Sequence, residues 1–332
     1  YHTGGLNIWY VRDLARKLLN IADEALASLA PAKLSHGVTE TRIGHNRRVP
    51  QPDGSVGWGV NVDGSYDAHT PVLHIERGGR AAAEARRIII VSHACHPTGS
   101  GGIDRWWHEY PGVMREKIRK QAGDDTQAMF IMGCGADGKQ TYRDGKTGEL
   151  AFSASPTRAR QAGRALARAA MKLINAGDAM SPLTGPLHTA AAAGTLTMKP
   201  AKSQRELERM AYDGDDALYS TWWARQMLAY PDRRRDYDYE VAAWRFGDEL
   251  TMLVLPGEVC SPLGPLARSL CRTPAAMSLA YCNKTDAYIP SKTIVREGGY
   301  EGCDSHMAYF LPGPFTTKVE NEFADIVRDA VR

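Results

Sequence analysis

The stretch Ile88-Ile89-Ile90-Val91-Ser92-His93-Ala94-Cys95-His96-Pro97-Thr98 joins a strongly apolar run to two imidazoles and a thiol. Four β-branched residues in a row predict a buried strand. Pro97 ends that strand, because proline cannot donate to a ladder. A rigid sheet holds side chains firmly at a strand end, so ligands and acid–base groups are well placed there. The stretch therefore predicts a central strand with a functional site at its end.

The segment Leu253-Val254-Leu255-Pro256-Gly257-Glu258 repeats this arrangement far downstream with a carboxylate. An imidazole and a carboxylate, each following an apolar strand, favour a metal-dependent hydrolase over a binding module.

Predicted helices and strands alternate along the chain, which indicates an α/β fold, with α+β as the alternative. We expect mixed sheets flanked by helices in a single large catalytic domain, residues 1–332, because no linker or internal repeat divides the sequence. Helices are expected at 6–30, 106–120 (interrupted near Pro111), 155–175, 203–230, 262–271 and 314–331, strands at 34–43, 72–75, 88–95, 128–132, 187–200 and 275–281, a hairpin at 240–246 and 249–255, and a long loop at 44–71.

The charge balance argues against a nucleic-acid partner. The 332 residues hold 41 basic and 38 acidic side chains, a net charge of +3. No apolar stretch approaches the roughly 20 residues of a membrane span, and the six cysteines lack the C-x-x-C spacing of a zinc knuckle. No signal peptide is present, which leaves the compartment open.

His96 is the first candidate for a metal ligand, because neutral imidazole is a common zinc ligand. The alternative is a structural histidine held by hydrogen bonds. If the strand stays regular, His93 points to the opposite face or supports the site from behind. The alternative for His93 is again a structural role.

Glu258 follows Pro256-Gly257 and suits either a metal ligand or a general base. The alternative is an acid that the dipole of a following helix favours. Tyr288 leaves a strand and could bind a metal or hydrogen-bond an oxyanion, or it could be a buried aromatic.

The glycine-rich turn from Gly133 to Lys139 could present backbone N–H groups to an anion. It includes Gly135 and Asp137, and its spacing differs from that of a phosphate-binding P-loop. The turn is a weak signal by itself, because glycine-rich turns are common.

Seven motifs in a fixed order resemble the neutral/alkaline ceramidase family, in particular its bacterial branch, over nearly the whole chain. Members of that family are zinc-dependent amidases that cleave the N-acyl bond of ceramide. The motifs are His2-Thr3-Gly4, Asn46-Arg47-Arg48, Ala94–Thr98, Tyr110-Pro111-Gly112, Gly133 with Ala136-Asp137, Pro256-Gly257-Glu258, and Tyr288–Ser291 with Glu297–Tyr300.

The resemblance implies that His96, Glu258 and Tyr288 are zinc ligands. His2 is similar to the second histidine of the family's His-Thr-His element. The first histidine of that element would precede Tyr1, so an upstream segment or a second chain would complete the site, or His2 would be a ligand itself. Arg47 or Arg48 would contact the substrate or an oxyanion.

The resemblance also has a departure. The family carries a serine in a Gly-Asp-Val-Ser-Pro turn, and alignment on Asp137 places Lys139 there. We do not expect the family's C-terminal immunoglobulin-like domain within residues 1–332, because the last predicted element is the helix at 314–331. Relatives are often exported, so an exported protein is expected by resemblance alone.

We therefore expect a zinc-dependent hydrolase that cleaves an amide bond of a lipid or small N-acyl substrate, with Zn²⁺ lowering the pKa of its water to about 7. His2 or His93 would carry the proton to the leaving amine. The alternatives are a ceramidase-like binding subunit without catalysis and a hydrolase of an ester bond.

Overall fold

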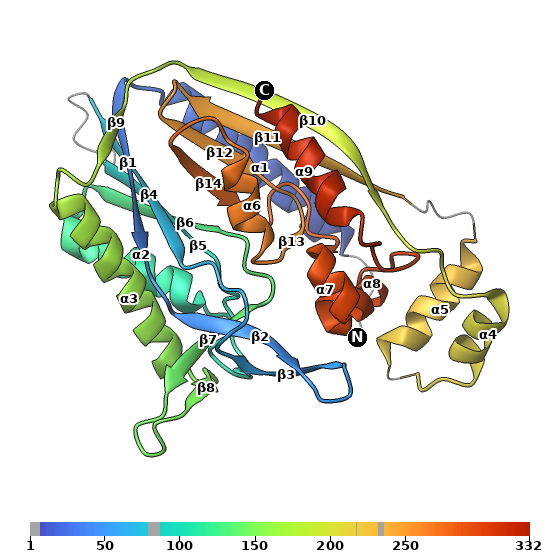
Figure 1. Cartoon of the computed structure of the whole chain (residues 1–332). Helices are drawn as coiled ribbons and strands as arrows, with labels where there is room; N and C mark the ends of the chain where they lie inside the picture. The colour runs from blue at the N-terminus through green and yellow to red at the C-terminus, as the bar shows by residue number, and fades with distance from the viewer. Residues whose placement is uncertain (1–6, 79–86, 217, 232–235) are drawn as a thin grey trace.

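The computed structural model describes residues 7–78, 87–216, 218–231 and 236–332. Helices and strands alternate along the chain (Figure 1), and the predicted α/β class with mixed sheets flanked by helices is confirmed. The helical elements are α1 (Ile8–Ala27), α2 (Glu109–Ala122), α3 (Pro156–Asn175), α4 (Gln204–Tyr212), α5 (Tyr219–Ala229), α6 (Leu263–Ser269), α7 (Lys292–Glu297), the π-helical turn η1 (Tyr300–Asp304), α8 (Ser305–Ala308) and α9 (Val319–Ala330). The strands are β1 (Ala32–Glu40), β2 (Gly44–Pro50), β3 (Val56–Asn61), β4 (His69–Arg77), β5 (Arg87–His93), β6 (Thr126–Met132), β7 (Gly138–Arg143), β8 (Leu150–Phe152), β9 (Ser181–Leu183), β10 (Leu187–Thr197), β11 (Asp236–Phe246), β12 (Leu250–Val254), β13 (Glu258–Val259), β14 (Ala275–Leu279) and β15 (Tyr288–Ile289).

The apolar run of the sequence forms β5, inside a five-stranded sheet with the order β6-β5-β4-β1-β9, here called sheet A. Strand β5 pairs in parallel with β6 and antiparallel with β4. Ile89 and Val91 pack toward α2 and α3, whereas Ile90 packs toward a second sheet. Because both faces of β5 are covered, the run is apolar throughout instead of alternating.

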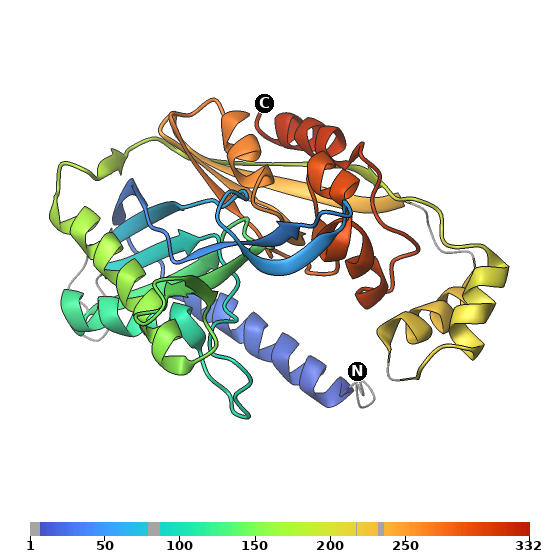
Figure 2. The same ribbon diagram turned by 60° about the horizontal axis from the view of Figure 1, so that its bottom comes forward.

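The second sheet, sheet C, has the order β10-β11-β12-β14 and mixes antiparallel pairs with the parallel pair β12–β14. Its inner side chains, such as Leu250 and Met252, pack against Leu73 of sheet A. Its outer side carries α6 and α9, with Phe323 of α9 in the core. The molecule thus stacks helices, sheet A, sheet C and helices in four layers (Figures 1 and 2).

The expectation of a long loop at 44–71 is wrong. This segment forms β2, β3 and the start of β4, and β2 lies between β3 and β7 in a four-stranded sheet, β3-β2-β7-β8, called sheet B. The pairing of β2 with β3 shifts register between Asn46 and Arg48. Such a bulge re-aims side chains, and it allows the consecutive Arg47 and Arg48 both to be buried.

The helix predicted at 106–120 also differs in detail. It begins at Glu109 and runs unbroken to Ala122. Pro111 lies in its first turn, where the missing N–H costs no helical hydrogen bond, so the expected interruption does not occur.

The predicted N-terminal helix is confirmed as α1, but its apolar side chains stay exposed. No residue of α1 is buried, and Trp9, Leu19 and Leu26 are all well exposed. Across the described part of the chain, none of the helices combines the length and apolar character needed to span a bilayer.

Candidate active site

His96 follows β5 at the edge where sheet A meets sheet B. Its backbone N–H donates to the Gly138 carbonyl at 3.1 Å, so the residue extends the sheet contact toward β7. Its side chain is 12% exposed. Burial, assisted by the charge of Arg47, lowers the pKa of His96 to about 3. The ring is therefore neutral near pH 7, and a nitrogen lone pair is available to bind a cation or accept a proton.

Glu258 and Tyr288 enter the same place on a short parallel pair of strands. Glu258 of β13 lies opposite Tyr288 of β15 in register. Gly257 precedes Glu258 with φ +79°, a backbone region that glycine adopts without strain, and this turn aims β13 back toward the site.

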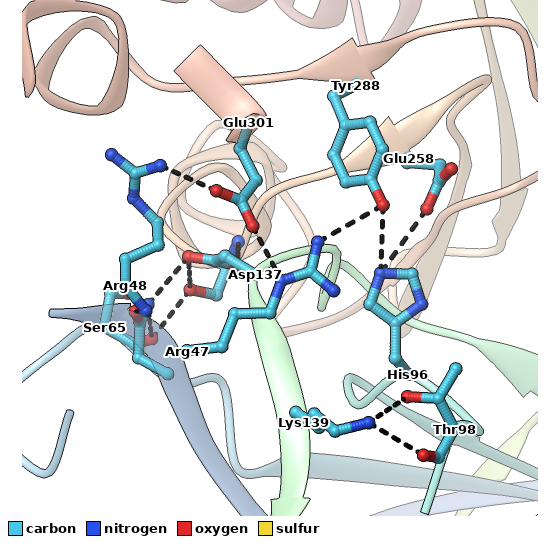
Figure 3. Close-up of polar contacts among 12 residues, drawn as sticks. Arg47, Arg48, Ser65, His96, Thr98, Asp137, Lys139, Glu258, Tyr288 and Glu301 are labelled. Atoms are coloured by element: carbon cyan, nitrogen blue, oxygen red, sulfur yellow. Dashed lines mark hydrogen bonds and ion pairs between the residues drawn. The ribbon is translucent and has the colours of Figure 1, made fainter. Parts of the chain in front are cut away.

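The three predicted ligand side chains converge, as Figure 3 shows. The Nε2 atom of His96 lies 3.4 Å from the Glu258 Oε2 atom and 3.5 Å from the Tyr288 hydroxyl. Two tyrosines that the sequence reasoning did not single out add to this group. The Tyr281 hydroxyl donates to Glu258 Oε2 at 3.0 Å, and the Tyr309 hydroxyl donates to Glu258 Oε1.

The converging side chains offer three kinds of metal-binding atom. An imidazole nitrogen, a carboxylate oxygen and a phenol oxygen are separated here by 3.4 and 3.5 Å. Neighbouring ligands of one tetrahedral zinc ion stand about 3.3–3.5 Å apart, because each bond is about 2.0–2.1 Å long. These atoms therefore fit a shared cation. No group of three His, Cys, Asp or Glu side chains that could hold a metal occurs among the described residues, so the phenol is needed to make three.

Arg47 faces this group from β2. Its Nη2 atom lies 3.3 Å from the Tyr288 hydroxyl, and its Nε atom donates to Glu301 Oε1 at 2.7 Å (Figure 3). Burial by itself would lower the pKa of Arg47. Glu301 and Tyr288 raise the pKa by more than burial lowers it, so the net pKa lies above its usual range. A permanent positive charge is thus fixed beside the Tyr288 oxygen.

Arg48 is turned away from the three converging side chains. It donates to Glu301 Oε2 at 2.7 Å and to Glu297 Oε2 at 3.1 Å. It lines a cavity of about 590 Å³ that does not include His96. The structure therefore gives Arg48 the role of holding Glu301, and Arg47 is the better placed of the two arginines predicted to contact substrate.

The glycine-rich turn packs its backbone closely against the end of β5. The N–H groups of Gly133, Ala136 and Gly138 all donate to protein carbonyls. A Cβ atom on Gly135 would stand 2.3 Å from the Ala94 carbonyl carbon, so glycine permits the close approach of the turn to β5. These three N–H groups are therefore already bonded within the protein, and the anion contact predicted for Gly135 stays a prediction.

Asp137 is fully buried, and other side chains occupy its oxygens. It accepts from Asn46 Nδ2 at 2.9 Å, from the Ser261 N–H at 2.7 Å and from the Ser261 hydroxyl at 2.8 Å. Burial raises the pKa of Asp137, and the Ser261 hydrogen bonds oppose that effect. Its geometry joins β2 to the segment after Glu258 and leaves no oxygen facing His96.

Lys139 lies below His96 and points to the loop that follows. Its Nζ atom donates to the Thr98 carbonyl at 2.7 Å and to the Thr98 hydroxyl at 2.9 Å (Figure 3). Burial and the nearby charge of Arg47 lower the pKa of Lys139. This lysine fixes the chain directly after His96.

His93 is the last residue of β5, and it is buried. One ring nitrogen lies 2.9 Å from the Tyr66 hydroxyl, and the other lies 2.9 Å from the Thr70 hydroxyl. Both nitrogens are occupied, and burial lowers the pKa of His93 to about 3. This placement supports the structural alternative for His93 and gives no support to a proton-transfer role.

His2, the remaining predicted ligand or proton carrier, lies outside the described residues. Its role and that of an upstream segment or second chain stay predictions.

The comparisons with known proteins agree with this geometry at the level of the fold. No sequence-family description matches the chain, and no curated protein matches it by sequence. Among solved structures, a neutral ceramidase from Pseudomonas aeruginosa superimposes with a TM-score of 0.66 at 15% identity, covering 94% of this chain. The chain has the neutral ceramidase fold. A ceramidase complexed with C2 superimposes with a TM-score of 0.65 at 14% identity, covering 93% of the chain. The chain spans 54% of the length of each of these ceramidases.

Proposed function

We propose that this chain is a hydrolase of N-acyl amide bonds that works with a zinc ion. The convergence of His96, Glu258 and Tyr288 from three separate segments, inside the fold of a neutral ceramidase, carries the proposal. His96 Nε2, a Glu258 carboxylate oxygen and the Tyr288 oxygen would hold the ion, together with an imidazole outside the described residues. A bound zinc ion supplies a Lewis acid for the scissile carbonyl and an acidified water.

The chain's own residues then divide the remaining work. Arg47 presents Nη2 toward the Tyr288 oxygen, and Glu301 fixes its orientation. A guanidinium in that position donates to the negative oxygen that develops on the substrate during hydrolysis, and it needs no reorganisation to do so. Tyr281 and Tyr309 each donate to one oxygen of Glu258, so both carboxylate oxygens have a fixed direction.

The substrate is an amide with an acyl chain, because the two solved neighbours are ceramidases. Lys139, which occupies the position of the serine found in the ceramidase family, distinguishes this chain near the site. We therefore include both ceramides and small N-acyl compounds in the proposed class, with esters of the same acyl chains as the comparison.

The test combines elemental analysis of the purified protein with hydrolysis of a panel of N-acyl amides and matching esters. His96→Ala and Glu258→Ala are expected to lose bound zinc and amide hydrolysis together. His188→Ala and Glu208→Ala, on exposed parts of β10 and α4, are the matched controls and should keep both. Full zinc occupancy in either site variant would contradict the ligand assignment.

A second function, a ceramidase-like binding subunit without catalysis, has one observation in its favour. The described residues bring a single imidazole and a single carboxylate to the site. Wild-type protein that binds an N-acyl amide in equilibrium dialysis, but retains no zinc and hydrolyses nothing in the panel, would establish this second function in place of the first.

A further inference from the structure

The two outer helices of sheet A together carry a larger net positive charge than the whole chain. Helices α2 and α3 contain nine Arg and Lys residues and two Glu residues, a net charge of +7. The whole chain has a net charge of +3, so the remainder carries −4. α3 has five basic side chains and no acidic one. The charge of the molecule is therefore concentrated on one face, here called the α2–α3 face.

Four cations of this face form a row on the exposed side of α3. Arg160, Arg164, Arg168 and Lys172 follow one another at four-residue intervals on the exposed side of α3, about 6 Å apart along the helix. Among the described residues, Arg164, Arg168 and Lys172 have no ion-pair or hydrogen-bond partner. Such a row repels itself, and an anionic surface would remove that repulsion.

A fully exposed tryptophan stands beside the row. Trp106, in the loop before α2, is 103% exposed. Its neighbour Trp107 packs under the guanidinium of Arg160, which lies 5.3 Å from the ring centroid. This contact ties the loop to the basic row of α3. Tryptophan side chains are enriched at the boundary between lipid headgroups and acyl chains, where an amphipathic ring is most stable.

We propose that the α2–α3 face binds the surface of anionic lipid bilayers, with Trp106 inserting at the headgroup level. Helices α2 and α3 lie side by side across one face of sheet A (Figures 1 and 2). A single-strand platform would need several exposed rings. On the described part of this face, Trp106 is the large hydrophobic side chain that stands exposed.

The face is connected to the candidate active site by short contacts. The N–H of Ser155, the N-cap of α3, donates to the Gly99 carbonyl at 3.0 Å, three residues after His96. The loop between His96 and α2 carries Trp106. A bilayer bound to this face would therefore lie against the loop that leaves the site. The proposal does not depend on amide hydrolysis, because it concerns adsorption alone.

The experiment is co-sedimentation of the full chain with two kinds of vesicle. One is phosphatidylcholine alone, and the other also contains about 30 mol% phosphatidylglycerol. The variant Arg164→Glu with Arg168→Glu reverses two cations of the row. Arg205→Glu with Arg209→Glu is the matched control, because these residues have the same spacing on the exposed side of α4.

We expect binding to the anionic vesicles alone, its loss at about 1 M salt, and a partition coefficient at least about 30-fold lower in the α3 variant than in the α4 control. Trp106→Ala should lower partitioning about three- to tenfold at each salt concentration where the wild type still binds. Unfolding curves of the variants that match the wild type exclude misfolding.

Equal binding to both kinds of vesicle, or an equal loss in the α3 and α4 variants, would overturn the proposal. Binding of duplex DNA more tightly than anionic vesicles would reassign the face to nucleic acid. Hydrolysis of a water-soluble short-chain amide is measured in parallel. If the wild-type protein binds anionic vesicles but does not hydrolyse this amide, the result counts against the proposed function only.

Discussion

Glu258 and Tyr288 lie directly opposite each other in the parallel pairing of β13 with β15. This register brings a carboxylate and a phenol to the same side of the pair, where His96 approaches both. The pairing is short, and Ala136 N–H and Cys260 N–H extend it by donating to the carbonyls of Val259 and Ile289. Backbone hydrogen bonds therefore help to fix the position of the candidate site.

The tyrosine pair around Glu258 leads to the first prediction. Tyr281→Phe removes the donor to Glu258 Oε2, and Tyr309→Phe removes the donor to Oε1. Loss of a hydrogen bond that orients a metal-binding carboxylate typically costs about 10–100-fold in metal affinity or activity. We expect each variant to fall in this range in zinc titrations while keeping its fold by circular dichroism. Unchanged zinc affinity in the double variant would contradict this role.

A buried ion-pair network gives the second prediction. Glu301 bonds both Arg47 and Arg48 inside the protein. Glu301→Gln leaves the buried Arg47 without a counter-charge and Arg48 with only the half-exposed Glu297, and we expect the free energy of unfolding to fall by about 3–5 kcal/mol in urea titrations. Glu297→Gln is the control, because Glu297 is 42% exposed and its pair with Arg48 contributes about 0–1 kcal/mol. Equal losses in the two variants would show that Glu301 is not the central residue of the network.

His93 predicts a pH dependence of stability. Burial lowers its pKa from 6.5 to about 3 in the folded protein. Between these values the unfolded chain binds a proton that the native protein does not, so stability falls as the pH decreases from about 6.5 toward 3. The slope contributed by one such group approaches about 1.4 kcal/mol per pH unit.

The measurement for His93 is urea unfolding at several pH values from about 4 to about 7, a range that covers most of the interval between its native and unfolded pKa values. His93→Gln is expected to be less stable at pH 7, because it cannot bond both Tyr66 and Thr70 as the imidazole does. Its stability should also change less steeply with pH. A slope equal to that of the wild type would assign the acid sensitivity to other groups.

The fourth prediction concerns the close approach of the glycine-rich turn to β5. Gly135→Ala places a Cβ atom 2.3 Å from the carbonyl carbon of Ala94, and the backbone must shift to relieve the clash. We expect a loss of about 1–3 kcal/mol in the free energy of unfolding, together with weaker zinc binding because His96 moves with the strand end. Gly145→Ala is the control, since no atom lies within 4 Å of its added Cβ. A Gly135 variant as stable as this control would show that the turn can relax freely.

The sequence predicted those parts of the fold whose signal is local. The apolar run before His96 marks a strand covered on both faces, and Ser155-Pro156 marks the start of α3 by a side-chain cap and a first-turn proline. The convergence of His96 with Glu258 could be anticipated because both follow apolar strands. These features need no knowledge of distant contacts.

Other features depend on partners far away in the chain, and composition could not reveal them. The segment with Asn46, Arg47 and Arg48 reads as a loop, yet Asp137 and Glu301 hold it as a strand with a bulge. Glu301 itself lies in a π-helical turn, 254 positions from Arg47 in the sequence. Its position directly after the Glu297–Tyr300 motif was the available signal.

The candidate site takes His96 from the end of sheet A, Arg47 from sheet B and Glu258 from the β13–β15 pair. A small molecule or ion that touches all three can bind only when these sheets are docked together. Such a compound raises the melting temperature by mass action, because the unfolded chain does not bind it. A thermal-shift screen of metal ions and acyl compounds can thus find what this protein binds before any reaction has been measured.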